Sequence, residues 1–560
     1  MSDPNMPNIW GEGKLFAFSG LDGETDWAHT LVASATEQPL GLCLHLNPDV
    51  PLIFASGVKR IEARVVLGDA VDLTAETAEG TGELRFVVAN RKMIIGEVTG
   101  ALSAGPAAEQ RTGAGHLVIR VVEKDGVLRF CVALAPEDAS EARAASLAGL
   151  LPPLDEMFTA RSAFVRGLDC SDLAEGADER TYRKCAEVLK LNARAPEGQI
   201  RRRWTTPDVW PHRHMWLWDS AFHALGWIEL DEEMARDCLL AVIEAQLPDG
   251  RIPLCDAPEP MNQRHSQPPI LAWAAWRVYE RTGDDEFLAA CYQPLCDFIE
   301  WWFRERYVNA NGLLEWLKEF EVERCRCGES GWDNSPRFDR ELVDDHVDLN
   351  SYAVREMRLL AKMAEALGRD EAKDWRHRAD EVAALMNEHL WNEELGLYLD
   401  RGPGDEGEWM LLKTAADFLP LIAGVPDAAQ AERLVAHLTD PAEFWAPVPV
   451  PTVAMDEPDY ADDMWRGPTW LNLNYLIWEG LKLYGYTDMA DQLRLRSMRA
   501  IERWYRESGV VFEYYDPADE THPYRLHRKG GVAGEGGTGF GVIRDYAWTA
   551  ATYLSWGRNR

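Results

Sequence analysis

The sequence predicts a protein of two parts, an N-terminal β-sandwich-like domain followed by a ring of six helical hairpins. Up to about residue 135, apolar and polar residues alternate with the period of two that is typical of strands. Beyond about residue 170, apolar residues recur with the period of amphipathic helices. In this second part short connections alternate with long ones, as expected when antiparallel helices are arranged around a common centre.

The N-terminal part contains four clear strand patterns and a hairpin turn. The strands are predicted at residues 60–67, 83–89, 116–122 and 127–133. Lys124-Asp125-Gly126 joins the last two and is typical of a tight turn. An Ala-rich helix over 137–151 follows and ends at Pro152-Pro153. We therefore predict a β-domain at 1–136, a helical linker at 137–170 and the helical domain at 171–560.

Twelve helix-patterned segments fill the C-terminal part and would pair into six hairpins. They are predicted at residues 177–192, 216–229, 231–246, 268–282, 285–307, 348–367, 371–390, 411–423, 427–438, 468–484, 488–506 and 544–557. Four short connections place a glycine where one helix stops and an aspartate where the next begins, at 283–284, 368–370, 424–427 and 485–488. The count of segments also allows an open solenoid, but no repeat of fixed period is visible, which favours a closed toroid.

Six long connections are rich in aromatic, acidic and turn residues. They cover residues 193–215, 247–267, 308–347, 391–410, 439–467 and 507–543. Connections of this length inside a compact domain usually carry function. Because consecutive helices run antiparallel, we expect all six to emerge at one face and to surround a central pocket.

Composition and charge limit the partners of the protein. With 560 residues, 46% of them hydrophobic, the chain can bury a large core, and its net charge of −35 opposes binding to nucleic acid or anionic membranes. No apolar run of about 18 residues indicates a membrane span, and the N-terminus does not resemble a signal peptide. We therefore expect a cytoplasmic protein with a small-molecule partner and reduced cysteines. The β-domain could pack on the helical domain or mediate formation of a homo-oligomer.

The first long connection contains residues that suit a sugar. Trp216 and Trp218 stand beside Asp219. The apolar face of a sugar can stack on an indole while its hydroxyl groups form hydrogen bonds with a carboxylate. The alternative interpretation is that both tryptophans belong to the core and that Asp219 caps a helix.

Two further acids have surroundings that suit acid–base chemistry. Asp333 lies in a connection rich in turn residues and follows a tryptophan, which can shield a general acid from water. Glu513 lies among apolar and aromatic residues in the sixth connection and is the natural second carboxylate. The alternatives are that Asp333 only forms a turn and that Glu513 points outward from a strand.

Other residues in the same connections complete the predicted site. The candidates for substrate binding, besides Trp216, Trp218 and Asp219, are Arg264, His265, Gln267, Trp332, Asn334, Arg337, Trp465, Arg466, Trp470 and Tyr514. Arg466 could bind sugar hydroxyl groups, keep a carboxylate ionised, or form a surface ion pair. No cofactor is predicted. A metal site is not expected either, because His212 and His214 lack a third ligand with recognisable spacing and Cys325 and Cys327 lack a second pair.

Several of these motifs together resemble glycoside hydrolase family 63, and most closely its bacterial mannosylglycerate and glucosylglycerate hydrolases. The resemblance covers about residues 170–560 and rests on Gly331-Trp332-Asp333-Asn334-Ser335-Pro336-Arg337, Trp218-Asp219-Ser220, Arg466-Gly467-Pro468-Thr469-Trp470 and Phe512-Glu513-Tyr514-Tyr515. It implies an (α/α)6 barrel and inverting hydrolysis of α-glycosides. It further implies that Asp333 is the general acid and Glu513 the general base. Trp218, Asp219, Arg466 and Trp470 would then line the subsite of the released sugar.

The identity of the substrate stays open at this point. The additional β-domain of about 150 residues distinguishes the chain from the compact solute hydrolases of the family. The first interpretation is an exo-acting α-glucosidase on a short α-glucoside, and the second is a mannosylglycerate or glucosylglycerate hydrolase. Two other classes remain, a sugar epimerase that uses histidines such as His223, His265 and His346, and a non-catalytic sugar-binding protein.

Overall fold

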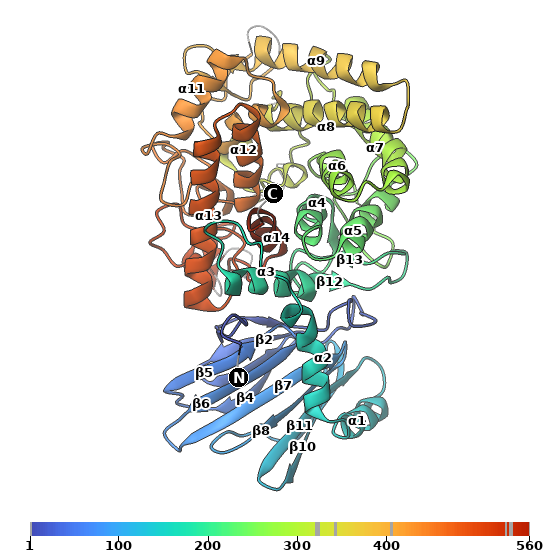
Figure 1. Cartoon of the computed structure of the whole chain (residues 1–560), viewed down its shortest axis with the longest axis vertical. Helices are drawn as coiled ribbons and strands as arrows, with labels where there is room; N and C mark the ends of the chain where they lie inside the picture. The colour runs from blue at the N-terminus through green and yellow to red at the C-terminus, as the bar shows by residue number, and fades with distance from the viewer. Residues whose placement is uncertain are drawn as a thin grey trace.

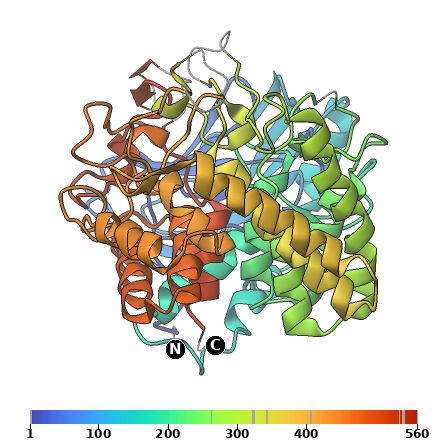
Figure 2. The ribbon, with the colours of Figure 1, turned by 90° about the horizontal axis from the view of Figure 1, so that it is seen from above.

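The protein has an N-terminal β-region and a C-terminal helical domain stacked on it (Figure 1). The computed structural model describes residues 3–261, 263–319, 325–340, 344–403, 407–532, 535–536 and 541–558. Figure 2 looks down on the helical domain, with the blue strands of the β-region lying behind it. The predicted order, a β-region before a helical domain, is confirmed. None of the described helices is both long and apolar enough to cross a bilayer.

The β-region consists of two antiparallel sheets. The smaller has the order β1 (Leu15–Phe16), β2 (Ala33–Glu37), β3 (Leu40–Leu44), β4 (Val50–Ala55). The larger has the order β5 (Arg60–Val66), β6 (Ala70–Glu76), β7 (Thr81–Asn90), β8 (Met93–Val98), β11 (Val127–Ala135), β10 (Gly115–Lys124), β9 (Ala108–Thr112). At the predicted hairpin Lys124 pairs with Val127, so Asp125 and Gly126 alone form the turn, with φ of 54° and 78°. Positive φ at both positions is what a type I′ turn requires.

A single apolar core lies between the two sheets. Phe16 and Phe54 of the smaller sheet pack on Phe86 and Phe130 of the larger one, with ring centroids 5.2 and 5.5 Å apart. Side chains alternate across each strand, so one face of each sheet supplies this core. Helices α1 (Ala139–Ala148) and α2 (Leu154–Arg166) then contact the outer side of the larger sheet and lead to the helical domain. The predicted domain boundaries at 136 and 170 remain predictions.

In the described part of the chain the helical domain contains twelve α-helices, one of them a short turn preceded by the 3₁₀ segment η3 (Ala415–Phe418). They are α3 (Glu179–Asn192), α4 (Leu217–Trp227), α5 (Glu232–Glu244), α6 (Leu271–Thr282), α7 (Asp285–Glu305), α8 (Val347–Ala366), α9 (Ala372–His389), α10 (Pro420–Ala423), α11 (Ala428–Leu438), α12 (Leu471–Leu483), α13 (Thr487–Ser508) and α14 (Ala547–Trp556). Helices α4, α6, α8, α10, α12 and α14 contact one another in that order, and α14 returns to α4. The helices form a closed ring, which excludes the open solenoid.

The structure confirms part of the helix capping that was predicted for the short connections. The four predicted glycines end helices with φ between 62° and 82°, at positions 283, 368, 424 and 485. Asp284 and Asp427 cap the following helices through their side chains, as predicted. Asp370 and Asp488 do not, because α9 starts after Glu371 and α13 after Tyr486. Asp488 lies inside the first turn of α13, where a negative charge still interacts favourably with the helix dipole.

Candidate functional site

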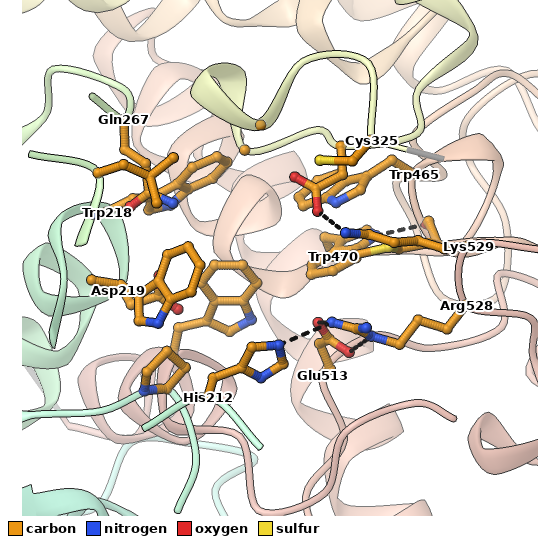
Figure 3. Close-up of a pocket in the computed structure, with 18 of the residues that line it drawn as sticks. His212, Trp218, Asp219, Gln267, Cys325, Trp465, Trp470, Glu513, Arg528 and Lys529 are labelled. Carbon is orange, nitrogen blue, oxygen red and sulfur yellow. Dashed lines mark hydrogen bonds and ion pairs between the residues drawn. The ribbon is translucent and has the colours of Figure 1, made fainter. Parts of the chain in front are cut away.

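A cavity of about 280 Å³ lies at the end of the helical ring where the long connections emerge (Figure 3). Its wall is formed by Pro207, His212, Trp216, Trp218, Asp219, Leu254, His265, Gln267, Glu319, Cys325, Gly328, Gly331, Asp333, Met464, Trp465, Trp470, Glu513, Arg528, Lys529, Tyr546 and Trp548. Five of the six long connections contribute to this wall, and the starts of α4, α12 and α14 complete it. Among the described residues, the connection between α9 and η3 contributes none. The expected convergence therefore holds for five connections.

The two predicted catalytic acids, Asp333 and Glu513, both line this cavity, and each forms an ion pair with a neighbouring cation. Asp333 Oδ2 lies 2.5 Å from Lys529 Nζ, and Arg528 Nε donates to Glu513 Oε2 at 3.1 Å. The backbone N–H of Ile543 donates to the same Glu513 oxygen at 3.3 Å. Figure 3 shows Arg528 and Lys529 reaching the cavity from the same side. Two consecutive residues therefore fix two carboxyl groups that are far apart in the sequence.

Electrostatics favour the charged forms of both cations. Burial alone would lower the pKa of Lys529, but the Asp333 carboxylate outweighs it and the pKa is raised. The pKa of Arg528 is raised in the same way, with Glu513 opposing the effect of burial. Burial, followed by the neighbouring Asp333, raises the pKa of the Cys325 thiol to about 12. Cys325 therefore remains a neutral thiol beside the Asp333–Lys529 pair.

His212 belongs to a chain of interactions that leads to Glu513. Its Nδ1 lies 2.6 Å from Oδ2 of the buried Asp208, and its Nε2 lies 3.3 Å from Nη2 of Arg528. A guanidinium group can only donate, so Nε2 must accept and Nδ1 must carry the proton that faces Asp208. His212 thus orients the guanidinium group that binds Glu513. This role differs from metal binding, for which no third ligand is recognisable in the sequence.

Asp219 is a buried carboxyl group on the first turn of α4. It is 3% exposed and accepts a hydrogen bond from the Tyr546 hydroxyl at 3.2 Å. Burial raises the pKa of Asp219 to about 7. Near neutral pH it can therefore act as a hydrogen-bond donor or acceptor toward a ligand. The residue at the N-cap of α4 is Trp216, which rules out the capping role considered for Asp219.

Stacked aromatic rings form one wall of the cavity. The rings of Trp465 and Trp470 are 3.7 Å apart and nearly parallel, at 8°. Trp332 stacks behind Trp465 at 5.2 Å, and Tyr514 packs behind Trp470 at 4.8 Å. Trp332 and Tyr514 therefore support the two rings that face the cavity.

Four tryptophans at the cavity wall have indole N–H groups that are buried and out of contact with the cavity space. The Nε1 atoms of Trp216, Trp218, Trp465 and Trp548 are buried and have no hydrogen-bond partner within the described residues. All four tryptophans line the cavity. The wall therefore offers a ligand the apolar surface of these rings, and not their N–H groups.

Seven of the predicted binding residues line the cavity and six do not. Those at the wall are Trp216, Trp218, Asp219, His265, Gln267, Trp465 and Trp470. Those outside it are Arg264, Trp332, Asn334, Arg337, Arg466 and Tyr514. The Tyr514 hydroxyl donates to the His527 carbonyl at 2.6 Å.

The remaining polar candidates have partners elsewhere or face solvent. Arg337 is 2% exposed and its guanidinium group binds the carboxylates of Asp348 and Asp400. Arg466 forms an ion pair with half-exposed Asp339 at 2.9 Å, the surface alternative considered above. Asn334 accepts a hydrogen bond from the backbone of Trp465, and Arg264 is exposed. Arg337, Arg466 and Asn334 therefore shape the connections that carry the cavity wall.

Sequence reasoning missed several cavity residues. The main ones are His212, Cys325, Arg528, Lys529, Tyr546 and Trp548. Arg528 and Lys529 gave one usable indication, because they are consecutive cations in a strongly acidic chain and follow Glu513 in the same long connection. One group of described residues has ligand atoms close enough to hold a metal ion, namely Cys43, His45 and Asp49 of the β-region. None of its members lines the cavity.

Comparison with known proteins identifies the family. Residues 212–549 match the model of the mannosylglycerate hydrolase MGH1-like glycoside hydrolase domain. The chain belongs to this family. It is therefore a glycoside hydrolase related to family 63, as its motifs predicted, and the epimerase and non-catalytic alternatives are set aside.

Relatives of known structure agree with this assignment. Mannosylglycerate hydrolase from one strain of Thermus thermophilus is 27% identical over 460 residues, covering 67% of this chain and 100% of the relative. Two crystal structures of the family 63 mannosylglycerate hydrolase from another strain of the same species also match, one with glucose and one with Tris and D-glycerate. Both are 26% identical over 67% of this chain and 99% of their own, with TM-scores of 0.53 and 0.54, respectively. A bacterial glucoamylase complexed with acarbose has a TM-score of 0.57 at 10% identity over 99% of this chain and 96% of its own. The last match shows a shared fold that includes the β-region.

Proposed function

We propose that the protein is an exo-acting, inverting α-glycosidase that releases one sugar from a short α-glycoside. The observation that carries the proposal is that Asp333 and Glu513, from separate connections, line one cavity of about 280 Å³. Ligand pockets usually have volumes of about 300–1,000 Å³. A cavity of about 280 Å³, just below this range, suits a short glycoside better than a polymer.

Asp333 would act as the general acid and Glu513 as the general base. Asp333 protonates the leaving oxygen while Glu513 removes a proton from a water molecule on the opposite face of the sugar. Inversion requires the two carboxyl groups to be about 6.5–9.5 Å apart, which leaves room for this water. Arg528 and the backbone N–H of Ile543 both contact Glu513 Oε2 and so fix the orientation of the carboxyl group that would act as the base.

The ion pair between Asp333 and Lys529 adds a requirement to this mechanism. A general acid must present its carboxyl group to the leaving oxygen, whereas Asp333 Oδ2 lies 2.5 Å from Lys529 Nζ. The bound substrate therefore has to separate Lys529 from Asp333 before the glycosidic bond breaks. Lys529 is 16% exposed and belongs to the cavity wall, so a ligand can reach it.

Asp219, Gln267 and the tryptophans would bind the released sugar. Gln267 accepts a hydrogen bond from the backbone N–H of Trp218 at 3.0 Å, which fixes its amide group at the wall. The Asp219 carboxyl group lies on the same side of the cavity (Figure 3). Together with the tryptophan rings, these residues offer hydrogen-bonding groups beside a stacking surface, as sugar binding requires.

The acid and base roles are tested by amide substitutions. Asp333→Asn and Glu513→Gln should each lower turnover about 10²- to 10⁴-fold while sugar binding is largely retained. Glu443→Gln is a matched control, because Glu443 is also paired with a lysine but lies outside the cavity. Proton NMR of the first product from an α-glycoside should show the β-anomer. Release of the α-anomer, or near-normal turnover of either variant, would contradict the proposal.

A carboxylate-bearing substrate is the second candidate, and Lys529 is the observation that favours it. A glycerate carboxylate could take the place of Asp333 on the ammonium group and so leave the Asp333 carboxyl group free to face the leaving oxygen. Relatives of this chain are mannosylglycerate hydrolases, and one solved relative contains D-glycerate. Mannosylglycerate and glucosylglycerate are therefore the anionic substrates to compare with neutral trehalose and kojibiose.

Product release from these four glycosides separates the two candidates. If the glycerate-bearing substrates are preferred, Lys529→Met should lower their kcat/KM at least about tenfold relative to the neutral disaccharides, since one charge-assisted contact is lost. Lys413→Met is the control, because Lys413 is equally exposed at 16% and pairs with carboxylates away from the cavity. A wild-type preference for kojibiose or trehalose would support a neutral α-glucoside instead.

A further inference from the structure

Four buried charged side chains form a closed ring where the β-region meets the helical domain. Lys14, which precedes β1, contacts Glu187 Oε1 and Asp545 Oδ2 through its Nζ, at 2.9 Å each. Lys184 Nζ contacts the other oxygen of each acid, Glu187 Oε2 at 2.8 Å and Asp545 Oδ1 at 2.7 Å. Positive and negative charges thus alternate around the ring.

The ring cannot lose one member without a large electrostatic effect. Its side chains are at most 2% exposed. Burial alone would raise the pKa of Asp545, but the ammonium groups of Lys14 and Lys184 outweigh it and lower the pKa. Charges without solvent contact are tolerated only when each is paired. Lys14 is the member that the β-region supplies, and it lies outside the segment 212–549 that matches the family.

Asp545 connects the ring to the candidate site. Its φ is 52°, in the left-handed region that residues other than glycine seldom adopt unless their surroundings hold them there. Its Oδ1 accepts a hydrogen bond from the backbone N–H of Val511 at 3.4 Å. The carboxylate therefore links the backbone two residues before Glu513 to the turn that precedes α14.

Residues on either side of Asp545 supply two hydrogen-bond donors to acidic residues of the cavity wall. Glu513 donates its backbone N–H to the Ile543 carbonyl at 3.0 Å, and Tyr546 donates to the Val511 carbonyl at 3.2 Å, so the two segments run side by side. On one side of Asp545, the Ile543 N–H reaches the Glu513 carboxylate. On the other side, the Tyr546 hydroxyl reaches Asp219. The conformation at Asp545 therefore determines where both donors point.

We infer that Lys14 is a positioning residue of the candidate site. Its ammonium group holds Asp545, and Asp545 holds the turn that presents the Ile543 N–H to Glu513 and the Tyr546 hydroxyl to Asp219. The β-region therefore contributes to turnover through one buried side chain, although none of its described residues lines the cavity. The inference rests on the role proposed for Glu513.

The test compares two lysines that connect the same two parts of the protein. Lys14→Met should lower kcat about 10- to 100-fold, since small displacements of catalytic groups have effects of this size, and should change KM less than about threefold. Lys190→Met is the matched control. Lys190 is 3% exposed, lies on α3 and pairs with Asp69 and Asp22 of the β-region, at 2.6 and 3.0 Å. The partners of its ammonium group, Asp69, Asp22 and the Arg161 carbonyl, all lie outside the segments at 511–513 and 543–546, so kcat of the variant should stay within about twofold of wild type.

A second measurement separates this inference from the proposed function. Amide hydrogen exchange at 511–513 and 543–546 should become at least about tenfold faster in Lys14→Met and unchanged in Lys190→Met. If wild type hydrolyses no α-glycoside, the proposed function fails, and exchange still tests the ring. If Lys14→Met does not fold, Lys14→Met/Glu187→Gln restores the charge balance and should show the same loss of kcat. Equal kcat and equal exchange in the Lys14 and Lys190 variants would overturn the inference.

Discussion

The two ends of the helical ring differ in what their connections do, and two glycines show the difference. Gly283 ends α6 at the end of the ring with the short connections, here called the plain end, and has φ of +62°. Gly331 lies at the opposite end, the cavity end, and has φ of +78°. A Cβ atom at Gly283 would meet no other atom within 4 Å, whereas one at Gly331 would lie 1.8 Å from the Trp218 ring. At the plain end, this left-handed backbone conformation therefore serves only to end a helix. At the cavity end, it allows the backbone to pack directly against the Trp218 ring in the cavity wall.

Charged groups follow the same division. At the plain end, the side chains of Asp284 and Asp427 cap helices that are open to solvent. At the cavity end, Arg337 is buried between two carboxylates, and Arg528 is buried against Glu513. Substitutions at the plain end should therefore cost only a little stability. At the cavity end they should affect stability, turnover or both.

The largest effect on stability is expected at Arg337. Arg337→Met would leave Asp348 and Asp400 buried without a counter-charge, and breaking a buried ion pair in this way costs about 3–5 kcal/mol. Urea unfolding would measure this loss. Arg466→Met is the control, because the exposed pair of Arg466 with Asp339 should contribute about 0–1 kcal/mol. Similar losses for both variants would remove the distinction between buried and surface pairs.

The largest effect on activity without loss of a charge is expected at Gly331. Gly331→Ala would push the Trp218 ring out of the cavity wall, and misplacement of a binding group by about 1 Å can lower kcat/KM about 10²-fold. Steady-state kinetics would detect this. Gly328→Ala is the matched control, because Gly328 also lines the cavity but its Cβ would meet Cys325 Sγ at 3.5 Å, an ordinary contact. Wild-type kinetics for Gly331→Ala would mean that Trp218 does not contribute to the site.

Sequence patterns predicted the ring and the positions of the two acids because both depend on local information. Helical periodicity and capping residues place each helix, and antiparallel order then brings the long connections to one end. Asp333 and Glu513 reach the same cavity for this reason. Their partners Arg528 and Lys529 could not be assigned, because which carboxylate each cation meets depends on how the connections fold over one another.

Two of the six predicted binding residues outside the cavity wall, Trp332 and Tyr514, are direct neighbours of the two acids in the sequence. In both places the two consecutive side chains point to different sides of the connection. Asp333 faces the cavity while Trp332 packs behind the wall, and Glu513 and Tyr514 are divided in the same way. A motif therefore identifies the segment that forms a site, whereas the direction of each side chain requires the structure.

The protonation of Asp219, at the cavity end, should make the free energy of unfolding depend on pH. Its pKa of about 7 in the folded protein lies above the ordinary value of about 3.9. Between these values the unfolded chain loses the proton while the folded protein keeps it, so the free energy of unfolding falls as pH rises, by up to about 1.4 kcal/mol per unit. Asp219→Asn should remove this slope in urea unfolding measured from pH 4 to 8.

A second buried acid provides the control for Asp219. Burial also raises the pKa of Glu356 to about 7, but Glu356 lies on α8 and binds backbone N–H groups at the start of α6 instead of lining the cavity. Glu356→Gln should remove a similar slope without changing sugar binding, whereas Asp219→Asn should change both. His212, Tyr546 and Glu513 face Asp219, and all three are unchanged in the variant. An unchanged slope in Asp219→Asn would show that Asp219 is ionised in the folded protein.

The smallest effect is expected at Gly283. Gly283→Ala keeps a left-handed backbone without a steric clash, so the free energy of unfolding should fall by only about 1 kcal/mol. Asp284→Ala, which removes the cap of the next helix, should cost a similar amount. Neither position contacts the cavity, so kcat and KM should equal those of wild type. A loss of turnover in either variant would mean that the plain end transmits strain through α6 to the cavity, and the two ends would then not be independent.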